Sequence, residues 1–87
     1  MMKSSRNKIL FTARALKDLQ KIDKDTQKRI GSRLKEYAIE PLKHARKLTD
    51  DKIGTYRFRI GDYRVIFDLN NSDIVILKIG HHRDIHK

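Results

Sequence analysis

The apolar residues in the first half of the chain recur at helical spacing. Lys8–Phe11 is a short apolar stretch that predicts a strand, and Thr12 is suited to cap the helix after it. The buried positions expected in this helix are Ala13, Leu16, Leu19 and Ile22. A second helix is predicted between the capping residues Asp23 and Asp25 and a stop at Glu40-Pro41. Its core positions are Thr26, Ile30, Leu34, Tyr37 and Ala38. The two helices are expected to form a helical hairpin.

In the second half of the chain the spacing of apolar residues changes to two. Residues 56–60 and 63–69 alternate in this way on either side of Gly61-Asp62, which predicts two strands joined by a tight turn. A turn at 70–73 and an apolar third strand over 74–79 follow, and the third strand suits an interior position. Residues 42–54 are expected to be irregular, anchored by Leu42 and Leu48. The segment from 80 to 87 is expected to leave the sheet.

The predicted hairpin separates apolar from charged side chains. With Gly61 and Asp62 in the turn, one face is wholly apolar and must pack against the helices. That face carries Tyr56, Phe58, Ile60, Tyr63, Val65, Phe67 and Leu69. The opposite face carries Arg57, Arg59 and Arg64, and Arg59 lies directly across from Arg64.

Opposed arginines are a poor choice for the stability of a sheet alone. Like charges at opposed positions are unfavourable by up to ~1 kcal/mol. Guanidinium groups, however, stay charged and bind phosphate oxygens in a forked geometry. The three arginines therefore predict an anion-binding face. The alternative is that Asp62, Asp68, Asp84 or a carboxylate of the tail neutralises them.

Composition adds the class of partner. The 87 residues support one domain, 1–87, and carry 21 Lys and Arg against 11 Asp and Glu, a net charge of +10. Such a charge favours a polyanionic partner. Cysteine is absent, which excludes disulfides, thiolate metal sites and cysteine nucleophiles. Apolar runs are too short to span a bilayer, and no apolar segment follows the basic residues 1–6, so a cytoplasmic protein without a secretory signal is expected.

Other basic and titratable residues lie outside the hairpin. The predicted helices have a basic face, which is either a solvated surface or a surface that binds RNA. It carries Arg14, Lys17, Lys21, Lys28, Arg29, Arg33 and Lys35. The tail holds His81, His82 and His86, which no acid or cysteine completes into a metal site. Histidine beside a phosphate-binding cluster suits acid–base chemistry, and the sequence does not select one of the three.

The segments 56–67 (YRFRIGDYRVIF) and 76–86 (ILKIGHHRDIH) resemble the RelE/ParE superfamily of toxin–antitoxin toxins. The order of strand, two helices and three strands is similar as well, so the resemblance covers nearly the whole chain. It implies an α+β fold, in which a small antiparallel-rich sheet of about four strands (order β-α-α-β-β-β) packs on an N-terminal helical hairpin.

Within the superfamily, the chain is most similar to the RelE branch. This resemblance implies a metal-independent endoribonuclease that cleaves mRNA in the ribosomal A site, through attack of a 2′-hydroxyl on the adjacent phosphate. Catalytic residues of the branch match Arg57, Arg59, Arg64 and Arg83. His86 stands where some members have a tyrosine, and His82 is the reserve candidate for acid–base chemistry. Lys17, Lys21, Lys28 and Arg33 become the candidates for binding RNA and the ribosome.

The resemblance also implies partners and alternatives. A cognate antitoxin is expected to bind the toxin in a hetero-oligomer, and ribosome and mRNA are the other partners, with no membrane and no cofactor. The ParE branch of the superfamily instead inhibits DNA gyrase and is not a nuclease. A third interpretation is a basic domain that binds RNA or protein without chemistry.

Overall fold

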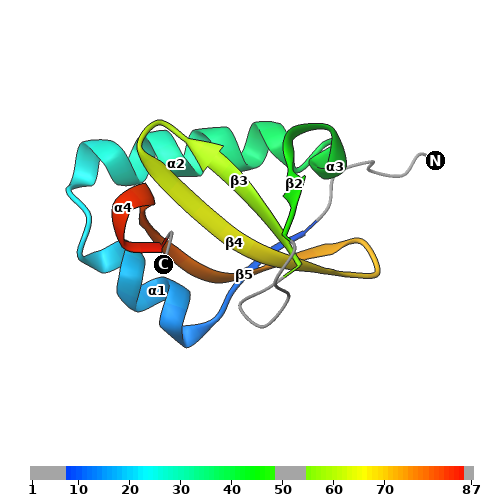
Figure 1. Ribbon diagram of the computed structural model, residues 1–87, viewed down its shortest axis with the longest axis horizontal. Coiled ribbons are helices and arrows are strands. Elements are labelled where there is room, and N and C mark those ends of the chain that lie inside the picture. The colour runs from blue at the N-terminus through cyan, green and yellow to red at the C-terminus, as the bar shows by residue number, and fades with distance from the viewer. Residues whose placement is uncertain (1–7, 49–54, 86–87) are drawn as a thin grey trace.

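A sheet of five strands runs through the part of the molecule that the structure describes (Figure 1). This computed structural model describes residues 8–48 and 55–85. The strands are β1 (Ile9–Phe11), β2 (Arg46–Lys47), β3 (Tyr56–Ile60), β4 (Tyr63–Asn70) and β5 (Asp73–His81). The helices are α1 (Ala13–Gln20), α2 (Lys24–Tyr37), α3 (Pro41–His44) and α4 (His82–Ile85).

The spatial order of the strands is β1-β5-β4-β3-β2. β1 runs parallel to β5, and the other neighbours are antiparallel, so the predicted α+β class with an antiparallel-rich sheet is confirmed. The prediction of about four strands was one short, because the short edge strand β2 lies in the segment that was expected to be irregular. α3 lies in the same segment and begins with Pro41 in its first turn, where proline costs no hydrogen bond.

Both long helices begin at the predicted caps. The Thr12 hydroxyl accepts the N–H of Ala15, and the Asp23 carboxylate accepts both the hydroxyl and the N–H of Thr26. These two bonds, the hydroxyl first, hold the pKa of Asp23 below its ordinary value. The stabilisation that the ionised Asp23 cap gives to α2 is therefore fully present at pH values above the ordinary pKa of an aspartate. It is lost as the pH falls through the lowered pKa of Asp23.

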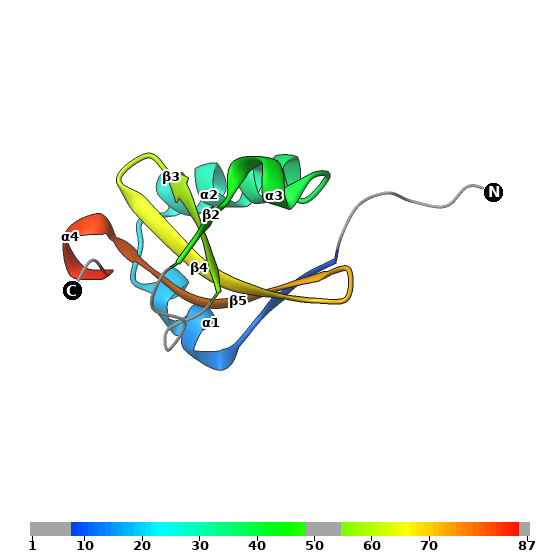
Figure 2. The ribbon, with the colours of Figure 1, turned by 45° about the vertical axis from the view of Figure 1, so that its right-hand side comes forward.

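The core lies between α1 and α2 and one face of the sheet (Figure 2). The helices contribute Ala15, Ile22, Ile30, Leu34 and Ala38, and the sheet contributes Phe58, Ile60, Val65, Phe67, Ile74, Ile76 and Ile79. The predicted apolar face of the hairpin is thus confirmed as the core face. None of the described helices combines the length and the apolar character needed to cross a bilayer.

Three expected core residues of the first half are on the surface instead. Ala13 is exposed, Leu16 is 45% exposed, and Ala15 is the fully buried residue of α1. The reason is that Ala15, Leu19 and Ile22 also follow helical spacing, and a small side chain at position 15 lets α1 approach the sheet closely. Leu42 was expected to be an anchor but is 58% exposed.

The β3–β4 hairpin has the predicted register. Arg59 pairs with Arg64, Phe58 with Val65 and Arg57 with Ile66. Gly61 begins the turn at a φ of +58°, in the left-handed region that glycine adopts at little cost. The predicted second turn is also present, and joins β4 to β5 between Asn70 and Asp73.

An irregularity in β5 decides which of its side chains enter the core. Ile66 pairs with Lys78 and Phe67 pairs with Ile76, so Leu77 is an extra residue, as in a β-bulge. As a result Lys78 lies on the face away from the helices, and Ile79 is buried. β5 then continues to His81, so the expectation that the chain leaves the sheet at Gly80 was wrong.

Candidate functional site

Four arginines meet on the sheet face that the long helices leave uncovered. Arg57 and Arg59 come from β3 and Arg64 from β4, as predicted from the hairpin. β2 adds Arg46, which pairs directly with Arg57. We call these four residues the arginine cluster. It contains two directly opposed pairs of like charges, each of which is unfavourable for the sheet in the absence of an anion.

Arg64 is the buried member of the cluster. Its exposed fraction is only 8%, and the structure gives its Nε no hydrogen-bond partner among the described residues. A position on the sheet face away from the helices suggests an exposed side chain, and the burial of Arg64 corrects that expectation. Its partner on β5 is Gly80, which has no side chain, and its neighbour Ile66 on the same face is also buried. A buried guanidinium N–H without a partner is costly, and a bound anion relieves that cost.

Acidic residues do not neutralise the arginine cluster within the described part of the chain. The ion pairs found there are Arg14–Asp18, Arg33–Glu36 and Lys43–Glu40. Asp68, one of the expected neutralising groups, instead accepts the N–H of Thr55 at 2.7 Å. The side chain of Asp84 lies outside the described residues. The positive charge of the cluster is therefore available to an anion.

The C-terminal candidates that the structure describes lie together at the end of β5 and on α4, where the rings of His81 and His82 are 4.7 Å apart. Arg83 and His82 are exposed on α4, which contacts β4 and β5. The N–H of His82 donates to the carbonyl oxygen of Asp62 at 2.8 Å, which ties the start of α4 to the hairpin turn. His81 packs edge-on against Tyr63, with ring centroids 5.6 Å apart. His86 lies outside the described residues.

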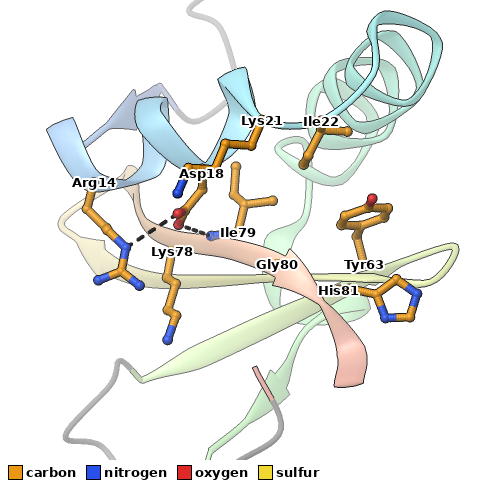
Figure 3. Close-up of a pocket in the computed structure, with 9 residues that line it drawn as sticks. All are labelled: Arg14, Asp18, Lys21, Ile22, Tyr63, Lys78, Ile79, Gly80 and His81. Carbon is orange, nitrogen blue, oxygen red and sulfur yellow. Dashed lines mark hydrogen bonds and ion pairs between the residues drawn. The ribbon is translucent and has the colours of Figure 1, made fainter. Parts of the chain in front are cut away.

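A second basic region lies beside α1 and is shown in Figure 3. It is a hollow of about 360 Å³ whose lining includes Arg14, Lys21 and Lys78. Asp18 lies among them and accepts the N–H of Ile79 at 3.0 Å as well as the Arg14 guanidinium. The carboxylate therefore joins α1 to the free edge of β5 and offsets part of the local positive charge.

The predicted RNA-binding residues of the helices are separate from the arginine cluster. Lys17, Lys21, Lys28 and Arg33 are all exposed, and α1 and α2 pack on the opposite face of the sheet from the cluster. These four side chains are thus accessible on the surface of the helices. Arg33 shares its charge with Glu36 at 3.5 Å.

Two basic residues on the sheet face that carries the arginine cluster could not be found from the sequence. Arg46 stands in a strand of two residues, which is too short to show a period. Lys78 reaches this face only because of the extra residue Leu77. A regular continuation of the β4–β5 register would have placed Lys78 opposite Val65 in the core. The alternation of polar and apolar residues along the sequence does not indicate that either residue lies on this face.

The chemistry open to the cluster is that of a phosphate site. Guanidinium groups donate to phosphate oxygens and stabilise charge that develops on them. They remain protonated and cannot act as a general base. Among the described residues, no three His, Asp or Glu side chains gather as metal ligands would.

Comparison with known proteins gives consistent matches over almost the whole chain. A family model described as the ParE toxin of the type II toxin–antitoxin system parDE matches residues 9–86. Toxin RelG of Mycobacterium tuberculosis is 31% identical over 86 residues, which cover 91% of this chain and 94% of RelG. Toxin RelE3 of Methanocaldococcus jannaschii is 27% identical over 88 residues, with the same two coverages of 91% and 94%.

Solved structures agree with the sequence comparisons. The crystal structure of the toxin–antitoxin complex RelBE2 from Mycobacterium tuberculosis contains a chain that superposes with a TM-score of 0.76. The identity is 25%, and the match covers 87% of this chain and 98% of that chain.

Proposed function

The chain belongs to the RelE/ParE superfamily of toxins of type II toxin–antitoxin systems, and on this premise we propose that it is a ribosome-dependent mRNA endoribonuclease. The observation that carries the proposal is the arginine cluster, in which the buried Arg64 has no partner for its Nε among the described residues. A cluster of guanidinium groups with a buried, unpaired N–H is better suited to bind a phosphodiester than to bind only the surface of another protein. The RelE-type relatives support the same branch.

The proposed reaction is a transesterification within the RNA strand. The 2′-hydroxyl oxygen attacks the adjacent phosphorus, and the bond from phosphorus to the 5′-oxygen of the next nucleotide breaks. The products are a cyclic phosphate and a free 5′-hydroxyl. One proton leaves the 2′-hydroxyl, and one is delivered to the departing 5′-oxygen.

The arginines stabilise the charged phosphate in this reaction. Arg59 and Arg64 are opposed across the hairpin, so both guanidinium groups can approach the same phosphate from neighbouring strands. Arg57 extends the cluster along β3, and Arg83 is available from α4. Positive groups already in place stabilise a transition state without reorganising. The proton transfers fall to His86, with His82 in reserve, or to the ribosome.

The proposed partners follow from the function. Ribosome and mRNA place the protein in the cytoplasm. The similar RelBE2 structure is titled a toxin–antitoxin complex. We expect a cognate antitoxin whose acidic residues cover the arginine cluster, in a hetero-oligomer that buries more than ~1,000 Å².

Mapping of cleavage ends tests the proposal. The purified chain is added to ribosomes programmed with a defined mRNA, and the 5′ ends are located by primer extension. Cuts within the A-site codon, with a cyclic phosphate on the upstream fragment, are the expected result. The same mRNA without ribosomes is the control. Intact mRNA under conditions in which the chain binds the ribosome would contradict the proposal.

A second candidate function is inhibition of DNA gyrase, as in the ParE branch. The match to the ParE family model favours it. A gyrase supercoiling assay with and without the protein distinguishes the two. Inhibition of gyrase together with intact mRNA would support the ParE-type activity, and the reverse pattern would support the endoribonuclease.

Ribosome docking is expected to depend on the helix lysines and on salt. Lys17→Glu, Lys21→Glu or Lys28→Glu should weaken ribosome binding several-fold at low salt, because each removes a cation that displaces counterions from rRNA. The dependence of log affinity on log salt should flatten by about 1 per lost contact. The cleavage position should not change, since these lysines lie across the sheet from the cluster. Sedimentation with ribosomes over a salt series measures this, and a salt-independent affinity would contradict it.

His86 is predicted to act as the general base that removes the proton of the 2′-hydroxyl. His86→Ala should lower the single-turnover rate roughly 10²-fold and remove the acidic limb of the pH–rate profile, with ribosome affinity unchanged. If His86 only stacks on a nucleobase of the mRNA, His86→Tyr retains most activity and keeps the acidic limb of the pH–rate profile. His82→Ala is the parallel test for the reserve residue. Unchanged rates in both alanine variants would remove histidine from the mechanism.

A further inference from the structure

A hollow of about 300 Å³ lies at one end of the arginine cluster, between α3, β2 and β3. Its lining comprises Lys43, His44, Ala45, Arg46, Arg57 and Arg59. The two arginines of β3 are thus shared between the hollow and the proposed cleavage site. A ligand that occupies the hollow is therefore a direct neighbour of a phosphate held by the cluster.

His44 is held in place at this hollow by a stack of aromatic rings. Its imidazole lies 4.3 Å from the ring of Tyr37, at an interplanar angle of 16°. Tyr37 in turn packs on the fully buried Phe58 at 5.0 Å. The imidazole is thus anchored to the core through Tyr37, although His44 itself is exposed. A ring that is already ordered loses little conformational entropy when a ligand stacks on it.

The hollow is basic without local compensation. The hollow beside α1 contains Asp18, whereas no acidic residue of the described part of the chain lines this one. Lys43 is paired with Glu40 at 3.2 Å, but Arg46 and Arg57 form no ion pair with any described residue. A phosphate near Arg46 and Arg57 would also relieve the repulsion between these two opposed arginines.

We propose that this hollow binds one nucleotide of the single-stranded RNA next to the cleaved bond, with Arg46 and Arg57 on a phosphate and His44 stacked on the base. The inference rests on the proposed endoribonuclease function and adds a substrate subsite to it. The chemistry is that of single-strand recognition, in which basic groups follow the backbone and aromatic rings stack on unpaired bases.

The test measures binding of a short 2′-O-methyl RNA, which lacks the attacking hydroxyl and cannot be cleaved by this route. Fluorescence anisotropy is recorded over a salt series. Arg46→Gln should weaken binding about tenfold at low salt and flatten the salt dependence by about 0.7, the value for one single-strand phosphate contact. Lys47→Gln is the matched control, because it removes the same charge from the neighbouring residue, which points to the other face of the sheet. Its effect should stay within about twofold.

The base contact is tested separately. His44→Ala should weaken binding about 5- to 10-fold, the lower range for loss of one stacked base, and His44→Phe should restore it. RNAs with a single abasic position are then compared. One abasic position should weaken binding to the native protein, and that loss should disappear in His44→Ala.

The outcomes separate the subsite from the proposed function. Equal effects of Arg46→Gln and Lys47→Gln, or no effect of His44→Ala, would overturn the subsite while leaving the cleavage assay to judge the endoribonuclease. Competition by an acidic peptide as effective as RNA of equal charge would also overturn it, and would assign the hollow to a protein partner. Absence of RNA binding by the native chain would also overturn the subsite, whereas the endoribonuclease would still be judged by the cleavage assay on programmed ribosomes.

Discussion

Replacing Arg64 by methionine is expected to lower the rate of mRNA cleavage by about 10²- to 10³-fold and to leave the protein as stable as before or more stable. Arg64 as a whole residue is 8% exposed, and its Nε is buried without a partner among the described residues. A buried guanidinium N–H without a partner costs free energy in the unbound protein, and methionine fills similar space without that cost. The same removal takes a preorganised donor away from the transition-state phosphate.

Two comparisons make this prediction specific. Arg64→Lys keeps the charge but loses the forked donor geometry, so we expect a loss of about tenfold or more. Arg29→Met makes the same substitution at an exposed position of α2, and its single-turnover rate at saturating protein should stay close to that of the native protein. A lower melting temperature with an unchanged cleavage rate in Arg64→Met would show that Arg64 is structural. An equal loss in Arg29→Met would show that the rate reports net charge alone.

The site could be predicted from the sequence where local rules decide the geometry. A two-residue turn at Gly61-Asp62 determines every pairing of the hairpin, so the opposition of Arg59 and Arg64 follows from the turn alone. The caps at Thr12 and Asp23 are equally local, since each needs only a side-chain oxygen and the N–H three residues on. These features require no knowledge of the rest of the fold.

The parts that could not be predicted depend on long-range contacts. Leu77 is extra in β5 because β4 and β5 must match the turn at one end and the core at the other, and this shift sets the face of Lys78. Arg46 joins the cluster only when β2 docks on β3. The burial of Arg64 likewise comes from the segments packed around it, and the alternation of residues shows only which face it is on.

Core placement in the helices shows the same limit. Helical spacing is satisfied by Leu16 as well as by Ala15, and only the distance between α1 and the sheet selects the smaller residue. Leu42 follows the last turn of α2 and is apolar, but α3 turns it toward solvent at 58% exposure. Hydrophobicity without a regular neighbouring pattern therefore gave the wrong anchor.

Phe67→Ala is expected to lower the free energy of unfolding by about 3–5 kcal/mol, the range for deleting a fully buried aromatic ring. Phe67 has no exposed surface, and its ring stacks on Phe58 at 4.3 Å and on Tyr56 at 5.6 Å. The total free energy of unfolding expected for a chain of this length is only about 4–13 kcal/mol. The substitution should therefore leave a large unfolded fraction, measurable as a fall in the urea midpoint.

Leu42→Ala is the control that decides between the sequence pattern and the structure. If Leu42 were a buried anchor, its truncation to alanine would lower the free energy of unfolding by roughly 2–5 kcal/mol. Truncation of an exposed leucine should change stability by no more than about 0.5 kcal/mol, and the structure places Leu42 in the second class. The sheet that carries the arginine cluster then depends on the stacked rings of β3 and β4, because Phe67 lies on the same strand as Arg64. A loss at Leu42 as large as that at Phe67 would contradict this placement of the core and would make α3 one of its main supports.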